Sequence, residues 1–218
     1  ANIIFTGSTN TFSAAPTLAN DGTLTFGNAT GDSFTFNGGL TTSSVAGTVT
    51  LNTSISSSDD NLIFGAITLG NNVTIDTNST TTNRADITIG AVTGGSQNLT
   101  FTTENNITGA NITASGAISN VGALTLNSVG GTATFSGDVD AESLTFDNTV
   151  ANVALTGNGS TITNPFSPSN DGTLQLGDAP NDTLTFIGGI NEGTTGTVTL
   201  FGSFVSSNDA ITFGAIAL

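Results

Sequence analysis

The side chains of this sequence that could bind a ligand are mostly carboxylates. In "GDVDAE", Asp138, Asp140 and Glu142 alternate with other residues, so all three would point to one side of an extended strand. Such hard oxygen ligands suit Ca²⁺. The spacing matches no EF-hand loop, and a solvated acidic face is the alternative interpretation. We therefore predict Asp138, Asp140 and Glu142 as calcium ligands and expect no other cofactor.

The residue types needed for acid–base or nucleophilic catalysis are almost missing. The chain has no His, Cys, Tyr, Trp or Met. Serine is plentiful, but no histidine exists to activate a serine nucleophile. The carboxylate pairs Asp59/Asp60 and Asp138/Asp140 lie in turn-like segments without an aromatic platform for a sugar. The sequence therefore predicts that the protein is not an enzyme.

The charge balance excludes two classes of partner. The 218 residues include 16 acidic residues and one base, Arg84, which gives a formal net charge of −15 at pH 7. One cation cannot neutralise a phosphate backbone, so we expect no nucleic-acid partner. Anionic membrane surfaces are excluded for the same reason. No apolar run approaches the roughly 18 residues of a membrane span, so direct membrane insertion is not expected.

Two distant segments of the chain are copies of one another. "NDGTLTFGNATGD" at Asn20 recurs as "NDGTLQLGDAPND" at Asn170, and the similarity covers residues 1–69 and 151–218 after one residue is dropped. Roughly 30 of about 68 aligned positions are identical, which indicates an internal repeat. We expect residues 1–218 to form a single continuous solenoid that holds about one and a half copies of a unit of about 150 residues.

Short alternating words fill the repeat unit. "TLTF" at Thr23, "TVTL" at Thr48 and "DITI" at Asp86 alternate polar with apolar residues, the period of a strand with one buried face. Several words are about 20 residues apart, separated by Gly and Asn turns, and no stretch has convincing helical periodicity. This pattern predicts an all-β protein, a parallel β-helix with coils of about 20 residues. An antiparallel β-sandwich is the competing fold.

The segments "NITASGAISNVGALTL" and "GALTLNSVGGTATFSGDVDAESLTF" resemble the repeats of filamentous haemagglutinin-type and autotransporter-type bacterial surface proteins. The resemblance covers most of the chain. It implies a right-handed parallel β-helix, export across the bacterial envelope, and a role as adhesin, fibre or surface layer. The expected location is therefore extracellular, at the cell surface, and surface glycans are candidate partners.

Neither end of the chain looks like the cap of a solenoid. "ANIIFTG" and "AITFGAIAL" are apolar and contain neither charge nor proline, whereas an open coil needs a cover. We expect end-to-end association, either with another subunit or with further coils of a longer parent chain. The predicted function is that of a non-catalytic structural protein, forming a fibre, adhesin stalk or surface layer.

A carbohydrate- or ice-binding module on the same solenoid is the alternative function. Thr-x-Thr words such as "TLT" and "TVT" resemble the threonine arrays of ice-binding solenoids, but they are spread over different phases of the predicted coil. Threonine is also a favoured outward residue of strands. The words therefore predict strands first, and a binding face only as the alternative.

Overall fold

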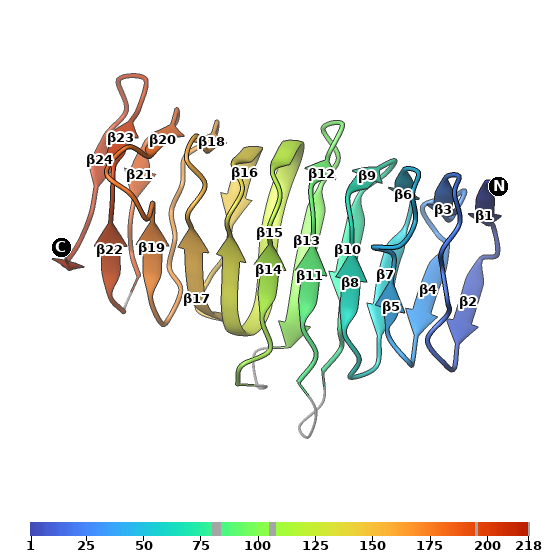
Figure 1. The fold of residues 1–218 in the computed structure, drawn as a ribbon. Coiled ribbons are helices and arrows are strands. Elements are labelled where there is room, and N and C mark those ends of the chain that lie inside the picture. Colours follow the sequence, from blue (N-terminus) through green and yellow to red (C-terminus); the bar gives the residue numbers. More distant parts are fainter. Residues whose placement is uncertain (80–83, 105–107, 195, 218) are drawn as a thin grey trace.

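In a computed structural model, the chain is a right-handed parallel β-solenoid of about 10 turns, with coils stacked about 21 residues apart. The structure describes residues 1–79, 84–104, 108–194 and 196–217. These residues contain no helix that could cross a membrane. Figure 1 shows the coils side by side along one axis. The parallel β-helix predicted from the word spacing is confirmed.

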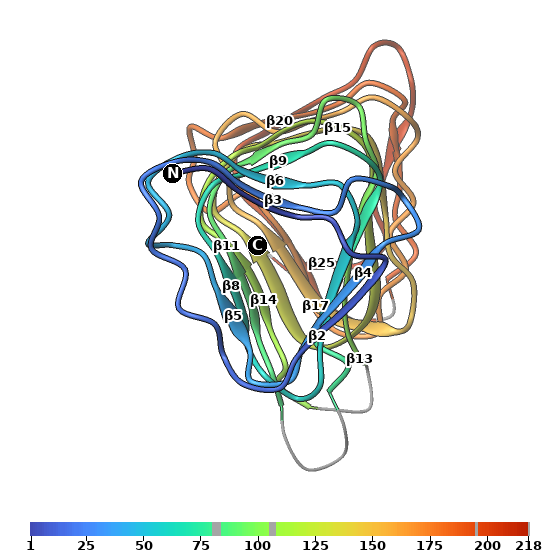
Figure 2. The ribbon, with the colours of Figure 1, turned by 90° about the vertical axis from the view of Figure 1, so that its right-hand side faces the viewer.

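Each coil contributes up to three short strands, which stack into three faces, named A, B and C in chain order; Figure 2 shows the coils along the axis as a rounded triangle. Face A holds β1 (Ile3–Phe5), β3 (Leu24–Phe26), β6 (Val49–Leu51), β9 (Ile67–Leu69), β12 (Val92–Thr93), the starts of β15 (Ile118–Phe135) and β16 (Val139–Thr145), β18 (Thr161–Ile162), β20 (Thr183–Phe186) and β23 (Ser203–Val205). Face B holds β2 (Thr9–Phe12), β4 (Ser33–Phe36), β7 (Ser54–Ser57), β10 (Val73–Asp76), β13 (Leu99–Glu104), the middle of β15, the end of β16, β21 (Ile190–Asn191) and β24 (Ile211–Thr212). Face C holds β5 (Leu40–Thr41), β8 (Leu62–Phe64), β11 (Ile87–Ile89), β14 (Ile112–Ala114), the end of β15, β17 (Val150–Leu155), β19 (Leu174–Leu176), β22 (Val198–Leu200) and β25 (Ile216–Ala217).

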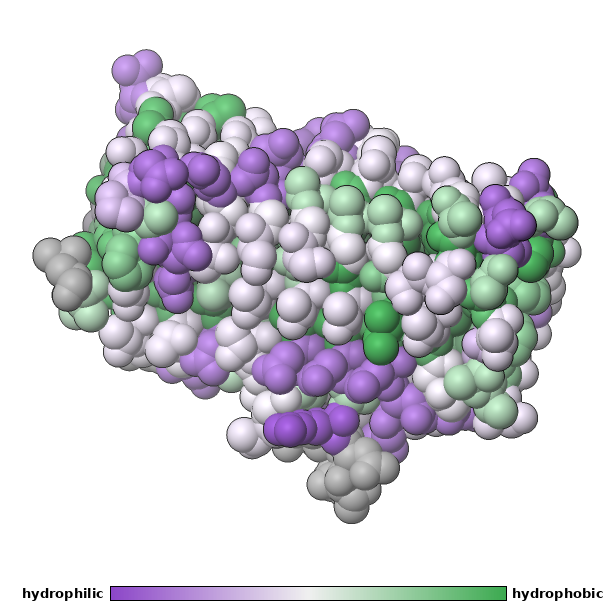
Figure 3. All heavy atoms as spheres, viewed as in Figure 1, coloured by the Kyte–Doolittle hydropathy of each residue, from purple (hydrophilic) through white to green (hydrophobic). Residues whose placement is uncertain are grey.

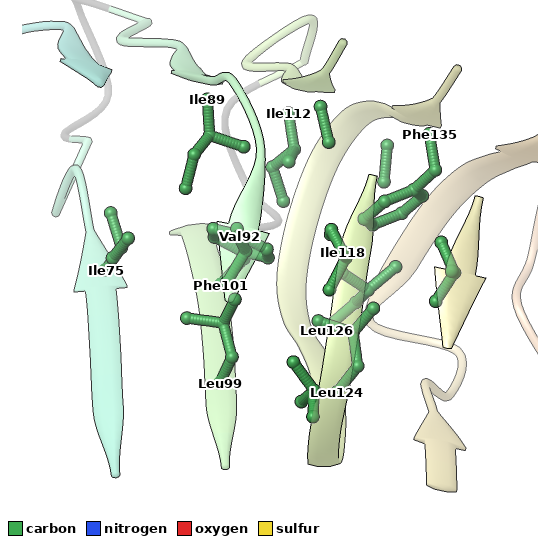
Figure 4. Packing of buried hydrophobic residues seen from close by; sticks show 14 of the residues in the cluster. Ile75, Ile89, Val92, Leu99, Phe101, Ile112, Ile118, Leu124, Leu126 and Phe135 are labelled. Atoms are coloured by element: carbon green, nitrogen blue, oxygen red, sulfur yellow. The ribbon is translucent and has the colours of Figure 1, made fainter. Parts of the chain in front are cut away.

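The apolar residues of the alternating words fill the inside of the triangle. In β3, Leu24 and Phe26 are fully buried, while Thr25 between them points outward. Since the coils stack in register, similar residues lie above one another, and the ring centroids of Phe12 and Phe36 are 4.8 Å apart. Figure 4 shows the same layered packing of apolar side chains in the central coils. Burial of these ladders is the main force that holds the coils together.

Asparagine and aspartate side chains join successive coils where the strands of face C begin. The Oδ1 atom of Asn61 accepts a hydrogen bond from the Asp86 N–H at 2.8 Å, and Oδ1 of Asp86 accepts one from the Asn111 N–H at 2.8 Å. Oδ1 of Asn111 continues the series to the Thr132 N–H at 2.9 Å. Figure 3 shows hydrophilic side chains gathered along this lower edge of the face. These bonds satisfy corner N–H groups that the strand ladders leave unpaired.

The two similar segments make the same strand pairs on different faces. Ile3 pairs with Leu24 on face A, whereas their counterparts Val153 and Leu174 pair on face C. Going from β1 in the first coil to β17 in the seventh, the chain advances six full coils and two further faces. A unit of this length is therefore not a whole number of coils. Each copy presents the same surface turned by about one third of a turn relative to the copy before it.

The equivalent asparagines Asn20 and Asn170 of the two segments differ in their hydrogen bonds because of one sequence difference. The amide nitrogen of Asn170 donates to the Thr173 carbonyl at 2.9 Å, and its Oδ1 accepts from the Thr194 hydroxyl at 3.0 Å. Asn20 makes the same donation to the Thr23 carbonyl at 3.0 Å, but its buried Oδ1 has no partner within the part of the chain that the structure describes. In the alignment of the two segments, Val45 stands where Thr194 supplies the hydroxyl.

We expect exchanging these two residues to move stability in opposite directions. Thr194→Val leaves the Oδ1 of Asn170 buried without a donor, which should lower the free energy of unfolding by about 1–3 kcal/mol. Val45→Thr supplies the missing donor to Asn20 and should raise it by up to about 1 kcal/mol. Urea unfolding followed by circular dichroism measures both. A loss of stability in both variants would show that the two asparagines are not equivalent.

Candidate functional site

The acidic segment predicted to bind calcium lies on face A, at the start of β16. Asp140 and Glu142 point outward and are exposed, while Val139 and Ala141, which alternate with them, point into the core. Their alternation is the one expected of an extended strand. Two carboxylates of the predicted set therefore lie side by side on one surface.

Asp138 lies outside that pair, before the strand begins. Its Oδ1 accepts a hydrogen bond from the Gly159 N–H of the next coil at 2.8 Å, so this carboxylate joins two corners of the solenoid. Over the described ranges, no group of three or more side chains of metal-binding type gathers anywhere. Calcium binding by Asp138, Asp140 and Glu142 stays a prediction, with Asp140 and Glu142 as its exposed part.

A shallow hollow of about 260 Å³ lies beside these two carboxylates, and Asn120, Asp140, Glu142, Thr161 and Thr163 line it. A β-bulge forms it. Ile118 pairs with Val139 and Val121 with Ala141, so β15 has one residue more than β16 over the same span. Asn120 takes up the extra length with a positive φ of 54°. The lining supplies oxygen atoms and no nucleophile with a base beside it, which suits a cation or hydroxyl groups.

The acidic residues of the repeated corner loops have a structural role. Oδ2 of Asp182 accepts hydrogen bonds from the N–H groups of Asp178 and Ala179 at 2.8 and 2.9 Å, and these bonds lower the pKa of Asp182. Asp32 holds the matching loop of the first segment through the N–H groups of Asn28 and Ala29. The hydrogen bonds fix each corner, and at Asp182 they favour the ionised form, so these carboxylates have a structural role.

Two further carboxylates have shifted pKa values, for different reasons. Burial raises the pKa of Asp76, and the N–H of Asn78 partly offsets this. The hydroxyl and N–H of Thr149 lower the pKa of Asp147. Each of these groups is bonded within its own turn, to a residue two positions later. The other predicted turn carboxylates, Asp59 and Asp60, lie at a corner where Asp59 has a positive φ of 69°.

Threonine side chains form a regular ladder on face A, which the sequence analysis did not predict. Thr25, Thr50, Thr68 and Thr93 occupy the same outward position in four successive coils and pair directly with one another. Only Thr25 and Thr50 of this ladder belong to Thr-x-Thr words, and the words themselves lie on different faces, as expected: the word at 132–134 lies on face C. The ladder of single outward threonines was not visible in the sequence because the coil length varies, from 18 residues between Val49 and Ile67 upward.

Comparisons with known proteins place no relative beside this chain: no protein family, no curated protein and no solved structure matches it.

Proposed function

We propose that this protein is a non-catalytic structural protein of the bacterial cell surface, which forms a fibre, adhesin stalk or surface layer by stacking of β-helical coils. The observation that carries the proposal is the continuous stacking of parallel coils from β1 to β25, which gives the chain the shape of a rod. A rod of this kind spans distance, and its surface of Thr, Ser, Asn and Gly stays hydrated without cations.

The composition and the surface support the same role. The resemblance to exported surface repeats favours an extracellular location, and the net charge of −15 keeps neighbouring rods apart laterally. Asp32, Asp138 and Asp182 are bonded into corners, Asp140 and Glu142 are exposed beside a shallow hollow, and no carboxylate has a histidine or cysteine partner, because the chain contains neither. Catalysis forms no part of the proposal.

Electron microscopy over a range of concentrations tests this function. We expect single rods at low concentration and end-to-end filaments one solenoid wide at high concentration, because the coils can continue across subunits. Side-by-side sheets with no axial growth would favour a surface layer built by lateral contacts. Dispersed single rods at every concentration would overturn the stacking proposal for this chain.

The threonine ladder of face A supports a second candidate, an ice- or carbohydrate-binding face. Ice-recrystallisation and glycan-array assays distinguish the two functions when they compare matched variants. Thr50→Leu/Thr68→Leu removes hydroxyls from face A, and Thr88→Leu/Thr113→Leu removes a pair that is adjacent in the same way on face C. We expect neither ice-recrystallisation inhibition nor glycan binding in the unsubstituted protein or in either double variant. Activity lost only in the face A variant would replace the structural proposal with the binding one.

A further inference from the structure

The outward positions of face A are polar in the internal coils and apolar at both ends. Register pairs connect Ile4 in the first coil, through the internal coils, to Val205 in the tenth. Between them the position is mostly threonine: Thr25, Thr50, Thr68, Thr93, Thr161 and Thr185. Ile4 is 61% exposed and Val205 45% exposed. Exposed apolar side chains thus stand in this outward ladder in the first and the last coil of the structure.

Two more exposed apolar residues lie in the last two coils. Ile187 has the same outward direction one coil earlier, two residues beyond the partner of Val205, and Phe201 lies at the corner just before β23. In the first segment, polar residues occupy the matching positions: Asn37 for Ile187, Asn52 for Phe201 and Ser56 for Val205. The fold of the unit does not need apolar residues there, since the first segment forms the same strand pairs with polar ones.

The inward residues of the last coil are also more exposed than their counterparts. Ile216 is 42% exposed, whereas the matching Ile67 in the first segment is 3% exposed under the following coil. Phe204 is partly buried, whereas the matching Ile55 is fully buried. In the first segment, the counterpart of the last coil is therefore covered by a further coil, whereas the last coil itself is not.

The backbone of the two end strands is complementary. In a parallel ladder, successive residues bond alternately to the two neighbouring strands. The Ile3 N–H donates to the Thr23 carbonyl in the second coil, so the N–H and C=O of Ile4 point to the open side. The Ser203 N–H donates to the Asp182 carbonyl in the ninth coil, so the N–H and C=O of Phe204 point to the opposite open side.

We propose that the last coil of one molecule binds the first coil of a second copy of this chain with face A on face A, pairing Ile4 with Val205. This inference rests on the proposed function and specifies the joint, by which we mean the contact between the last coil of one molecule and the first coil of the next. Ile3 then covers Phe204 in the core, and Ile4 joins Val205 and Ile187 in one outward apolar strip. Placing β1 on face B or face C instead would leave Ile4 away from this strip. Figure 3 shows hydrophobic surface at both ends of the molecule.

Both surfaces belong to a strongly acidic chain, so association should respond to salt in a defined direction. Like charges on the two copies repel, and added salt screens that repulsion. The joint itself uses apolar side chains and backbone hydrogen bonds. Sedimentation velocity should therefore show association that strengthens as ionic strength rises, the opposite of a joint built on ion pairs.

Charged substitutions test whether the strip is buried on association. Ile4→Asp and Val205→Asp should each weaken association by about tenfold or more, because each places a carboxylate without a partner in the joint. Thr113→Asp, at an exposed outward position in the middle of face C, adds the same charge and should leave association unchanged. Equal weakening by all three variants would mean that net charge, and no specific joint, controls association.

Disulfide trapping tests the rotation of the joint. The chain has no cysteine, so two single-cysteine variants can be mixed and oxidised without competing thiols. Directly opposed residues of neighbouring strands lie about 5 Å apart, a distance that a disulfide spans. Ile4→Cys should therefore link to Val205→Cys about tenfold more than to Thr212→Cys on face B or Ala217→Cys on face C.

The outcomes separate this joint from the proposed function. Filaments in which Ile4→Cys links mainly to Thr212→Cys or Ala217→Cys would overturn the face A joint and leave the stacking function intact. An absence of association at every concentration and ionic strength would overturn both. Preferential linking to Val205→Cys, together with the loss of association in Val205→Asp, supports both.

Discussion

Replacing Phe101 by alanine is expected to lower the free energy of unfolding by about 3–5 kcal/mol, the usual cost of deleting a buried ring. Phe101 is fully buried in a central coil, where it pairs with Ile75 of the coil before and Leu126 of the coil after. Figure 4 shows its side chain among the apolar residues of these layers. The cavity would therefore weaken two coil interfaces at once, and both neighbours are held by rigid strands that cannot close it.

Urea unfolding followed by circular dichroism measures this loss, with Thr100→Ala as the control. Thr100 is the neighbour of Phe101 in β13 and points outward, so its truncation should cost less than about 0.5 kcal/mol. Hydrogen exchange shows which coils are destabilised, because stability in a solenoid is divided among neighbouring coils. We expect faster exchange in β10, β13 and β15 of Phe101→Ala. Equal losses in the two variants would contradict the inward assignment of Phe101.

The alternating words were sufficient to predict which residues form the core. An apolar residue in a word such as Leu24-Thr25-Phe26 must point to the same side as the one two positions away, so strand and burial follow from local sequence alone. The face on which each word lies does not follow from local sequence. Val49 and Ile67 are 18 residues apart and Val73 and Leu99 are 26 apart, yet each pair is adjacent. Corners of variable length absorb the difference.

Because local sequence does not show which coils and corners come into contact, two features around the predicted calcium residues were missed. Alternation correctly placed Asp140 and Glu142 on one surface. The corner before Val139 was not visible in the sequence, and there Asp138 bonds to Gly159 of the next coil. The bulge at Asn120 was equally hidden, since it depends on how β15 pairs with β16. Contacts between coils, which decide both features, involve residues about 20 positions apart whose register no local pattern fixes.

A recurring glycine was a usable signal for that register. Gly65, Gly90, Gly116 and Gly137 each stand two residues before an inward apolar residue that opens a face A strand. They stack at the corner between faces C and A, where the backbones of successive coils approach closely. A Cβ atom on Gly137 would lie 2.3 Å from the carbonyl carbon of Gly116 and 2.5 Å from its oxygen. Only glycine fits this contact.

Gly137→Ala is therefore expected to lower the free energy of unfolding by about 3 kcal/mol, because backbone atoms of two coils must separate to admit one methyl group. The control is Gly31→Ala, where an added Cβ atom has nothing within 4 Å and φ is not in the left-handed range. That change should be neutral or stabilising by up to about 1 kcal/mol, since alanine restricts the unfolded chain. Thermal unfolding of the two variants compares the same chemical change at a closed and an open position. If Gly137→Ala is as stable as Gly31→Ala, successive corners do not pack at this distance, and the register of face A would have to be redrawn.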